Sequence, residues 1–262
     1  MHPFDWVNPL YSLSGFVVGL LVGQTGMGGG ALMTPLLILL FGVHPAAAVG
    51  TDLLYASVTK TFGTAVHGSH GTVNWRIVTR LATGSVPATA LTLLLITQFH
   101  LTSPAASQVI ASALGGMLLI TAICLLYRRR FLAVLGGRME RLSEAQVAVF
   151  TVVVGAALGM LVTISSVGAG ALGVTALLLL YPRLPMAVIV GSDIAHAVPL
   201  TLLGGAGHWW LGLVDTHLVV SLLAGSIPGI VLGSWFAIRV PEFVLRPIMA
   251  GTLVLIGMRL VL

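Results

Sequence analysis

The chain has 262 residues, of which 57% are apolar and only 7% are charged. A water-soluble domain carries about a quarter of its residues as charges, so this composition excludes one and predicts a protein embedded in a lipid bilayer. The formal net charge of +5 comes from arginines scattered at segment ends, which does not favour a nucleic-acid partner. The single cysteine, Cys124, excludes an intrachain disulfide and a cysteine-cluster metal site.

The sequence contains two related halves, because rare residues recur in order at nearly one spacing. The spacing is 140 positions, or 141 beyond an insertion near Arg183. The matched pairs include Gly28 and Gly168, Gly30 and Gly170, Asp52 and Asp193, His67 and His208, and Pro87 and Pro228. Apolar segments resemble one another by chance, whereas rare residues matched in order do not. We expect a first transmembrane repeat over 1–130, a cytoplasmic basic connection over 131–144 and a second repeat over 145–262.

Each half contains five apolar segments. They cover residues 10–24, 28–42, 46–66, 77–99 and 105–127, and then 146–163, 168–181, 187–207, 213–238 and 243–262. The third to fifth segments of each half reach the roughly 20 residues needed to cross a bilayer. The first two are short and enclose a glycine-rich stretch, so each pair is expected to form either two tilted helices or a re-entrant hairpin. No basic stretch precedes the first segment, so no cleaved signal peptide is expected.

The orientation in the membrane follows from the basic residues, which concentrate on the cytoplasmic side. The central connection holds Arg128, Arg129, Arg130, Arg138 and Arg141, and the other loops assigned to the inside hold Arg76, Arg80, Arg183, Arg239 and Arg246. The loops assigned to the outside, around 43–45, 100–104 and 209–212, hold no lysine or arginine. Both termini are therefore predicted to be external. Since five segments is an odd number, the predicted fold is an all-α polytopic membrane protein of two inverted repeats.

The glycine-rich stretches are candidates for an anion site. A helix break inside the membrane leaves backbone groups unpaired, and it persists only where it faces protein, water or a ligand. The helix that follows each break offers N–H groups and a dipole that favour an anion. The predicted substrate-binding residues are Thr25, Gly28, Gly29, Gly30, Thr51, Lys60, Ser165, Ser166, Gly168, Gly170 and Ser192. The alternative is that the glycines only let helices pack closely.

Ionisable residues inside the membrane form a second set of candidates, because each costs several kcal/mol there unless it is paired or hydrated. Asp52 and Asp193 occupy equivalent positions, and His196 follows Asp193 by three residues on one helix face. These three are predicted to couple transport to protons. A structural hydrogen bond between Asp193 and His196 is the alternative. Lys60 would neutralise the anion or, alternatively, extend its ammonium group to the cytoplasmic edge.

No catalytic residue, cofactor or metal site is expected. His67 and His70 have a spacing that suits a metal, but they lack a third ligand, so a surface role is expected for them. The chain has no P-loop and no serine with an organised histidine and acid. The pair Trp209 and Trp210, with His208 before them, is typical of an external membrane interface.

The chain resembles the TauE/SafE family of sulfite exporters, also called the toluene sulfonate uptake permease family. The resemblance rests on the glycines of 26–30 followed by Pro35 and Leu37, and on a second copy that reads GAGALGVTALL. Two positions depart from the family pattern: Asp52 stands where a serine is more usual, and Thr175 replaces the proline of the second copy. The resemblance implies transport of sulfite, sulfonates, sulfoacetate or related anions.

The sequence therefore predicts a secondary transporter in the cell (inner or plasma) membrane, exporting sulfite or a small organosulfur anion with proton coupling. A passive anion channel is the main alternative, and a membrane-bound enzyme is a weaker one. The expected partners are the small anion and the lipid bilayer, and assembly as a homodimer is left open.

Overall fold

The computed structural model describes residues 7–25, 32–98, 107–139, 141–236 and 242–261. Within these ranges the regular structure is entirely α-helical, which confirms the predicted all-α class. The helices are α1 (Pro9–Thr25), α2 (Met33–Leu39), α3 (Pro45–Ser69), α4 (Trp75–Gln98), α5 (Ser107–Met139), α6 (Glu144–Ser165), α7 (Ala171–Leu180), α8 (Met186–Trp210), α9 (Thr216–Phe236) and α10 (Glu242–Val261).

Most helices lie where the apolar segments predicted them, and two differences matter. Helix α5 continues to Met139, well past the predicted end at residue 127, so most of the basic connection over 131–144 is helical. Arginine is a good helix former, and its charge alone does not end a helix. Helix α6 has 22 residues and is therefore longer than the short first segment expected over 146–163. Helices α2 and α7 are short, with 7 and 10 residues, as expected for the second segment of each half.

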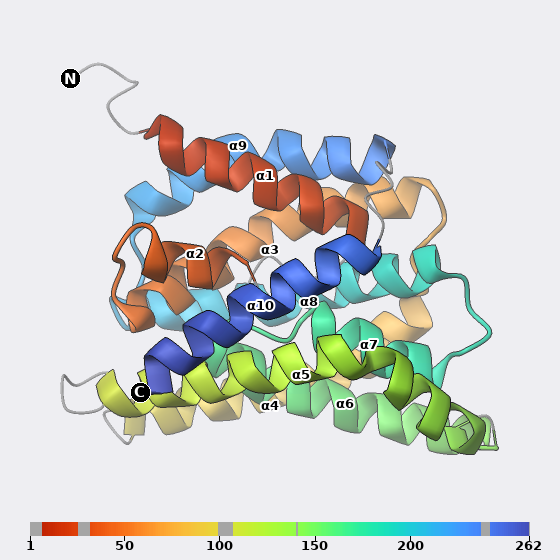
Figure 1. Cartoon of the computed structure of the whole chain (residues 1–262). Helices are drawn as coiled ribbons and strands as arrows, with labels where there is room; N and C mark the ends of the chain where they lie inside the picture. The colour runs from red at the N-terminus through yellow and green to blue at the C-terminus, as the bar shows by residue number, and fades with distance from the viewer. Residues whose placement is uncertain (1–6, 26–31, 99–106, 140, 237–241, 262) are drawn as a thin grey trace.

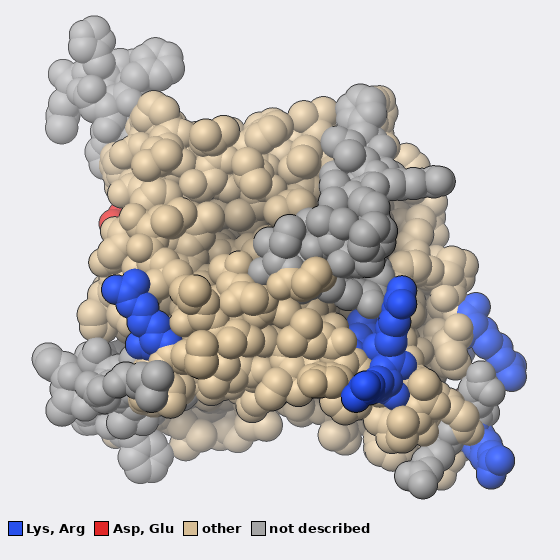
Figure 2. Space-filling view, in the orientation of Figure 1, with Lys and Arg blue, Asp and Glu red and all other residues tan. Residues whose placement is uncertain are grey.

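Four helices in the described part are long and apolar enough to cross a membrane: α4, α6, α8 and residues Thr216–Trp235 of α9. Their outward faces agree with that environment, since large apolar side chains such as Leu94, Val153 and Leu232 are exposed. On the face drawn in Figure 2, the basic side chains gather mainly toward the right-hand end, and the broad middle carries none. The long apolar helices and their exposed apolar side chains are therefore those of a membrane protein.

Helices of one half pack against helices of the other. In Figure 1, α3 and α8 lie side by side in the middle, with α1 and α9 above them and α4, α5 and α6 below. Helix α1 packs on α9, and the equivalent helix of the second half, α6, packs on α4. Helices α5 and α10 pack together at the side.

Equivalent glycines make the equivalent contacts in both halves. A Cβ atom at Gly15 would overlap the backbone of Leu222, and one at Gly155 would overlap the backbone of Leu81. These positions differ by the repeat spacings of 140 and 141. Small residues let membrane helices approach closely, so the glycines fix how α1 meets α9 and how α6 meets α4. The repeat is thus present in the packing, while the inverted orientation of the halves in the membrane stays a prediction.

Candidate functional site

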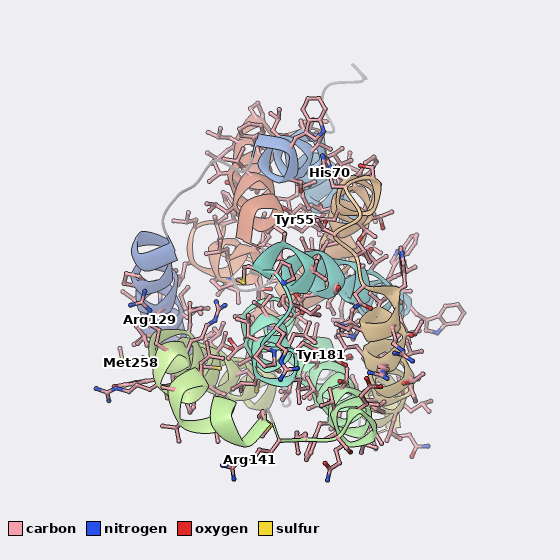
Figure 3. All side chains as sticks on the ribbon, turned by 90° about the vertical axis from the view of Figure 1, so that its right-hand side faces the viewer. Tyr55, His70, Arg129, Arg141, Tyr181 and Met258 are labelled. Atoms are coloured by element: carbon pink, nitrogen blue, oxygen red, sulfur yellow. The ribbon has the colours of Figure 1, made fainter. Side chains whose placement is uncertain are left out.

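The centre of the molecule holds the proton-coupling candidates and Lys60 on the two central helices. Asp52 and Lys60 lie on α3, and Asp193 and His196 lie on α8, with exposed fractions between 0% and 2%. Tyr55, on α3 near Asp52, lies in the interior when the molecule is viewed along its helices (Figure 3). The structure therefore brings together the proton-coupling candidates and the candidate anion ligand Lys60.

Asp52 is held by hydroxyl groups from two other segments. Thr34, in the first turns of α2, and Ser166, from the second half, both donate hydrogen bonds to Oδ2 of Asp52. The other oxygen, Oδ1, is buried and has no hydrogen-bond partner among the described residues. A buried carboxylate oxygen without a donor is costly, so Oδ1 is a natural point for a proton or a ligand to bind.

Ser166 reaches Asp52 because the chain breaks between α6 and α7. Ser166, Gly168 and Gly170 have φ values of 55°, 119° and 110°, in the left-handed region that favours glycine. All three residues are buried. Ser165 donates to the carbonyl of Leu161 at 2.7 Å, so its hydroxyl closes the last turn of α6. The predicted glycine-rich break of the second half is present and lies inside the protein.

Four residues predicted for the anion site belong to the first half and are not described in full. Gly28, Gly29 and Gly30 lie outside the described residues, and so does the side chain of Thr25. In the second half, the N–H groups of Leu172 and Gly173 both bond to the carbonyl of Gly168. These two N–H donors at the start of α7 are therefore already engaged in hydrogen bonds within the protein.

Asp193 lies against the first turn of α7. A Cβ atom at Gly173 would overlap Oδ1 of Asp193, so the glycine provides the space for this carboxyl group. Both oxygens of Asp193 are buried without a hydrogen-bond partner in the described part of the chain. The two carboxyl groups therefore differ: Asp52 has two hydroxyl donors, and Asp193 has none.

Lys60 is the single lysine of the chain and is 2% exposed. It does not extend to the membrane edge, as the alternative interpretation of the sequence required. Its charge interacts with both Asp193 and Asp52, but it forms no hydrogen bond to Asp193. The lysine is thus near enough to both carboxyl groups for their charges to interact, without a hydrogen bond to Asp193.

His196 and Tyr55 occupy equivalent places in the two halves. The Nε2 atom of His196 is hydrogen-bonded to Ser85 on α4 at 2.9 Å. Ser226, the repeat equivalent of Ser85, lies on α9 and is hydrogen-bonded to Thr59 at 2.7 Å. The direct bond weighed for Asp193 and His196 is absent, because the imidazole ring points to α4 and its Nδ1 has no partner in the described residues.

Thr51 in the first half and Ser192 in the second have the same structural role. The hydroxyl of Thr51 accepts the backbone N–H of Asp215, just before α9, at 3.0 Å. The hydroxyl of Ser192 accepts the backbone N–H of Asn74, just before α4, at 2.9 Å. Each hydroxyl is therefore engaged at a helix start, and a part in binding the substrate stays a prediction for these two residues.

The expectation that His208 faces the membrane interface is wrong, although the two tryptophans that follow are exposed. His208 is 5% exposed, and its Nε2 is hydrogen-bonded to the carbonyl of Thr163 at 2.9 Å. It is buried because its Cβ packs against Gly50 on α3, where no side chain intervenes. Trp209 and Trp210 are 56% and 91% exposed.

Sequence reasoning missed Thr34 and assigned no role to Ser85. Thr34 is a single hydroxyl in an apolar run, and nothing in its pattern points to Asp52. The repeat does pair Tyr55 with His196, but the sequence alone did not place Tyr55 in the binding or coupling set. Ser85 carries a similar signal, because the motif Gly-Ser-x-Pro recurs around Ser226.

Comparison with known proteins identifies the family. The profile of the family described as "Sulfite exporter TauE/SafE" matches residues 11–260. The probable membrane transporter protein YjnA of Bacillus subtilis is 38% identical over 251 residues, which cover 95% of this chain and 98% of YjnA. The probable membrane transporter protein YdhB of the same organism is 28% identical over 248 residues, which cover 92% of this chain and 97% of YdhB. No solved structure matches the chain. The chain therefore belongs to the TauE/SafE family of membrane transporters.

Proposed function

We propose that this protein is a secondary transporter of the cell membrane that exports sulfite or an organosulfur anion of the sulfonate type. The proposal also includes coupling to protons through Asp52, Asp193 and His196. It is supported by the description of the family as sulfite exporters and by the names of the relatives as membrane transporter proteins. The single observation that carries it is Lys60, buried together with two carboxyl groups.

A buried lysine in a membrane protein requires an explanation. A charge at the centre of a bilayer costs several kcal/mol unless it is paired or hydrated, and such residues mark ion and substrate pathways. Lys60 is 2% exposed, on a helix that packs against α8 at the centre of the fold. An ammonium group there offers a counter-charge to an anion that has left water.

Proton coupling follows from the balance of charges around Lys60. When both carboxyl groups are ionised, the cluster of Asp52, Lys60 and Asp193 has an excess of one negative charge, which repels an incoming anion. Protonation of one carboxyl group removes that excess, so anion and proton favour each other's binding. Asp193, which has no hydroxyl donor among the described residues to stabilise its charge, is the better candidate to carry the proton.

The orientation that we propose places both termini outside the cell and the end of α5 in the cytoplasm. It rests on the arginines of the central connection, including Arg128, Arg129 and Arg130. Helix α1 begins and α10 ends at the left of Figure 1, and α5 ends at the right. Accessibility of single cysteines introduced at these ends, on a Cys124→Ser background, would reveal their side. A homodimer stays a prediction.

The function is tested with the purified full-length protein in liposomes. Sulfite that accumulates inside when a pH gradient is imposed, above its equilibrium level, supports coupled transport. Flux that only dissipates a sulfite gradient and ignores the pH gradient would show a passive channel instead. If neither sulfite nor methanesulfonate moves, the proposed substrate class is wrong.

The role of Lys60 is tested in the same assay. Lys60→Met removes the counter-charge, and we expect the apparent affinity for sulfite to fall at least tenfold. Lys60→Arg keeps the charge and is the matched control, for which a smaller loss is expected. An unchanged affinity in Lys60→Met would remove this lysine from the anion site.

A further inference from the structure

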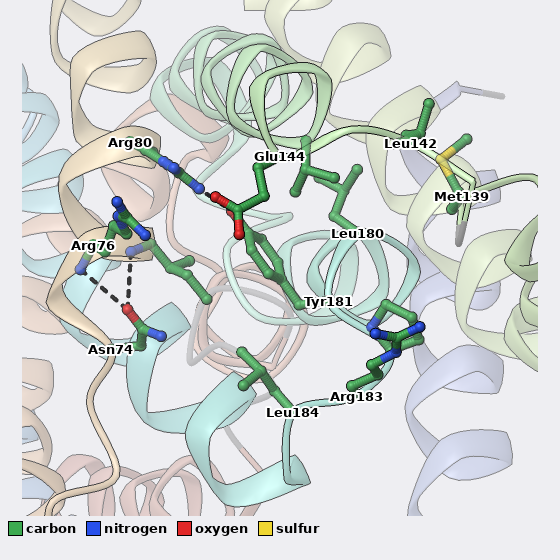
Figure 4. A pocket seen from close by; sticks show the side chains of 13 residues that line it. Asn74, Arg76, Arg80, Met139, Leu142, Glu144, Leu180, Tyr181, Arg183 and Leu184 are labelled. Atoms are coloured by element: carbon green, nitrogen blue, oxygen red, sulfur yellow. Dashed lines mark hydrogen bonds between the residues drawn. The ribbon is translucent and has the colours of Figure 1, made fainter.

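A second candidate binding site lies at the end of the molecule where α5 ends, in a cavity of about 340 Å³. Its walls come from the starts of α4 and α6 and from the loop between α7 and α8. Three arginines line it, Arg76, Arg80 and Arg183, together with Tyr181 and Glu144. In Figure 4, Arg80 extends toward Tyr181 on one side of the cavity, and Arg183 lies on another.

Tyr181 orients Arg80 through a chain of hydrogen bonds. Thr151 donates its hydroxyl proton to the carbonyl of Val147 at 2.6 Å. The hydroxyls of Thr151 and Tyr181 are 2.8 Å apart, so the proton between them belongs to Tyr181. The oxygen of Tyr181 is then free to accept from Nη1 of Arg80, at 3.2 Å. Tyr181 is thus a positioning residue, which fixes the guanidinium group in the cavity wall.

The cavity has a positive charge balance. Among the described residues that line the cavity, three guanidinium groups face one carboxylate, that of Glu144, which leaves an excess of two positive charges. Asn74 and Glu144 lie at the starts of α4 and α6, so the positive ends of two helix dipoles add to the positive charge of the cavity. Arginine also matches the geometry of an oxyanion, since it can donate two parallel hydrogen bonds.

The other half of the protein provides an internal comparison. The positions equivalent to Arg76 and Arg80 are His217 and Ser221, without a guanidinium group. The positions equivalent to Thr151 and Tyr181 are Tyr11 and Phe41, whose rings pack edge to face with centroids 4.6 Å apart. A preference of arginine for the cytoplasmic side explains the charge at one end. It does not explain why the arginines converge on one cavity, with a tyrosine that orients one of them.

Apolar side chains complete the cavity. Ile77, Val147, Leu180 and Leu184 line it beside the arginines. Such a lining suits a ligand with a charged head and a short apolar body better than it suits a fully hydrated inorganic ion. We propose that this cavity binds an organic oxyanion, with a sulfonate, phosphate or carboxylate head on Arg76, Arg80 and Arg183. The ligand is either a soluble anion or the head group of an acidic lipid.

The cavity is linked to the central site but does not depend on it. The backbone N–H of Asn74, in the cavity wall, donates to Ser192, the residue before Asp193. The first turn of helix α7 lies beside Asp193, at Gly173, and the helix ends at the cavity, beside Tyr181. A ligand in the cavity therefore touches the segments that border the buried carboxyl groups. The proposal concerns binding and does not require that sulfite be the transported substrate.

Binding is tested with the full-length protein in nanodiscs, on a Lys60→Met background that weakens the central site. In phosphatidylcholine nanodiscs, 1-butanesulfonate is titrated by calorimetry. In a second arm, phosphatidylglycerol is added and its retention is measured by native mass spectrometry. Both arms compare the background with Arg80→Gln, Arg183→Gln and the double variant. Arg129→Gln is the matched control, because Arg129 is exposed on α5 and does not line the cavity.

We expect the double variant to raise the Kd for butanesulfonate, or to lower the retention of phosphatidylglycerol, at least tenfold, and the control to stay within twofold in both arms. Loss of butanesulfonate binding alone identifies a soluble anion, and loss of phosphatidylglycerol alone identifies a lipid head group. The proposal is overturned if the double variant matches the Arg129→Gln control in both arms, or if the background binds neither probe. Arg183 is exposed, so Arg183→Gln remains informative even if Arg80→Gln does not fold. Sulfite flux is measured separately, so the proposed transport function and the proposed binding in this cavity can each be rejected without rejecting the other.

Discussion

Ser166 donates a hydrogen bond of 3.0 Å to the carboxyl group of Asp52, across the boundary between the two halves. Ser166 belongs to the break that precedes α7, and Asp52 belongs to α3. Ser166, which was expected to bind the anion, thus contacts Asp52 of the other half, which was expected to carry a proton. Any ligand that binds to the break therefore changes the surroundings of this carboxyl group.

Removing the hydroxyl donors of Asp52 should destabilise the protein. Thr34 is fully buried and donates to Oδ2, so Thr34→Val keeps the shape and removes the bond. Hydrogen bonds to charged groups contribute about 1.5–3 kcal/mol, and we expect a loss of that size in the free energy of unfolding. Ser166→Gly should act similarly, because the positive φ of Ser166 suits glycine and the loss then reports on the hydroxyl.

The measurement is denaturant unfolding in detergent, followed by tryptophan fluorescence. Thr97→Val is the control, since Thr97 is exposed and its hydroxyl bonds only to the carbonyl of Leu94 in the same helix. Stability of Thr34→Val equal to that of Thr97→Val would mean that Asp52 does not need these donors, and that it is protonated or otherwise paired.

Gly173 should tolerate no side chain. A Cβ atom there would overlap Oδ1 of Asp193, so Gly173→Ala must displace the carboxyl group or shift α7. Overpacking of this kind costs about 1–3 kcal/mol, and we expect transport of sulfite to fall at least tenfold. Gly116→Ala is the control: no described atom outside its own stretch of helix lies within 4 Å of the added Cβ, and alanine favours the helix. Equal transport by both variants would contradict the close contact between Gly173 and Asp193.

Thr51 and Ser192 should behave as helix anchors. Thr51→Val removes the acceptor of the Asp215 N–H, and Ser192→Ala removes that of the Asn74 N–H. Both bonds are part-buried, and a hydrogen bond of this kind contributes about 0.5–1.5 kcal/mol, so the midpoint of thermal unfolding should fall in each variant. The KM for sulfite should stay within twofold. A raised KM with an unchanged midpoint would instead place these hydroxyls in contact with the anion, as the sequence predicts.

The sequence predicts the helices better than their side-chain partners. The segments 46–66 and 187–207 nearly coincide with α3 and α8, because long apolar runs leave little choice of position. The C-terminal end of α5 was harder to predict, since its arginines interrupt the apolar run without interrupting the helix. Length and hydropathy therefore locate a membrane helix, but its polar extension beyond the bilayer leaves no apolar signal.

Contacts of the candidate site depend on how the helices are rotated, which hydropathy does not fix. The pairing of Asp52 with Ser166 required the position of the break relative to α3. The burial of His208 depended on Gly50, which makes room for it on the neighbouring helix. The repeat carried more information than any single motif, because it pairs Tyr55 with His196.

Asp193→Asn should separate transport from proton coupling. Asparagine has nearly the same size and fits beside Gly173, but it cannot take up a proton at neutral pH. If Asp193 carries the coupled proton, the variant should still move sulfite down its gradient and should lose at least 90% of the extra accumulation that a pH gradient produces. Flux is measured in liposomes with and without the imposed gradient. Asp52→Asn is compared directly, because Asp52 differs in having two hydroxyl donors. If the response to the gradient survives in Asp193→Asn and disappears in Asp52→Asn, the proton is carried by Asp52, and the missing donors of Asp193 have another cause.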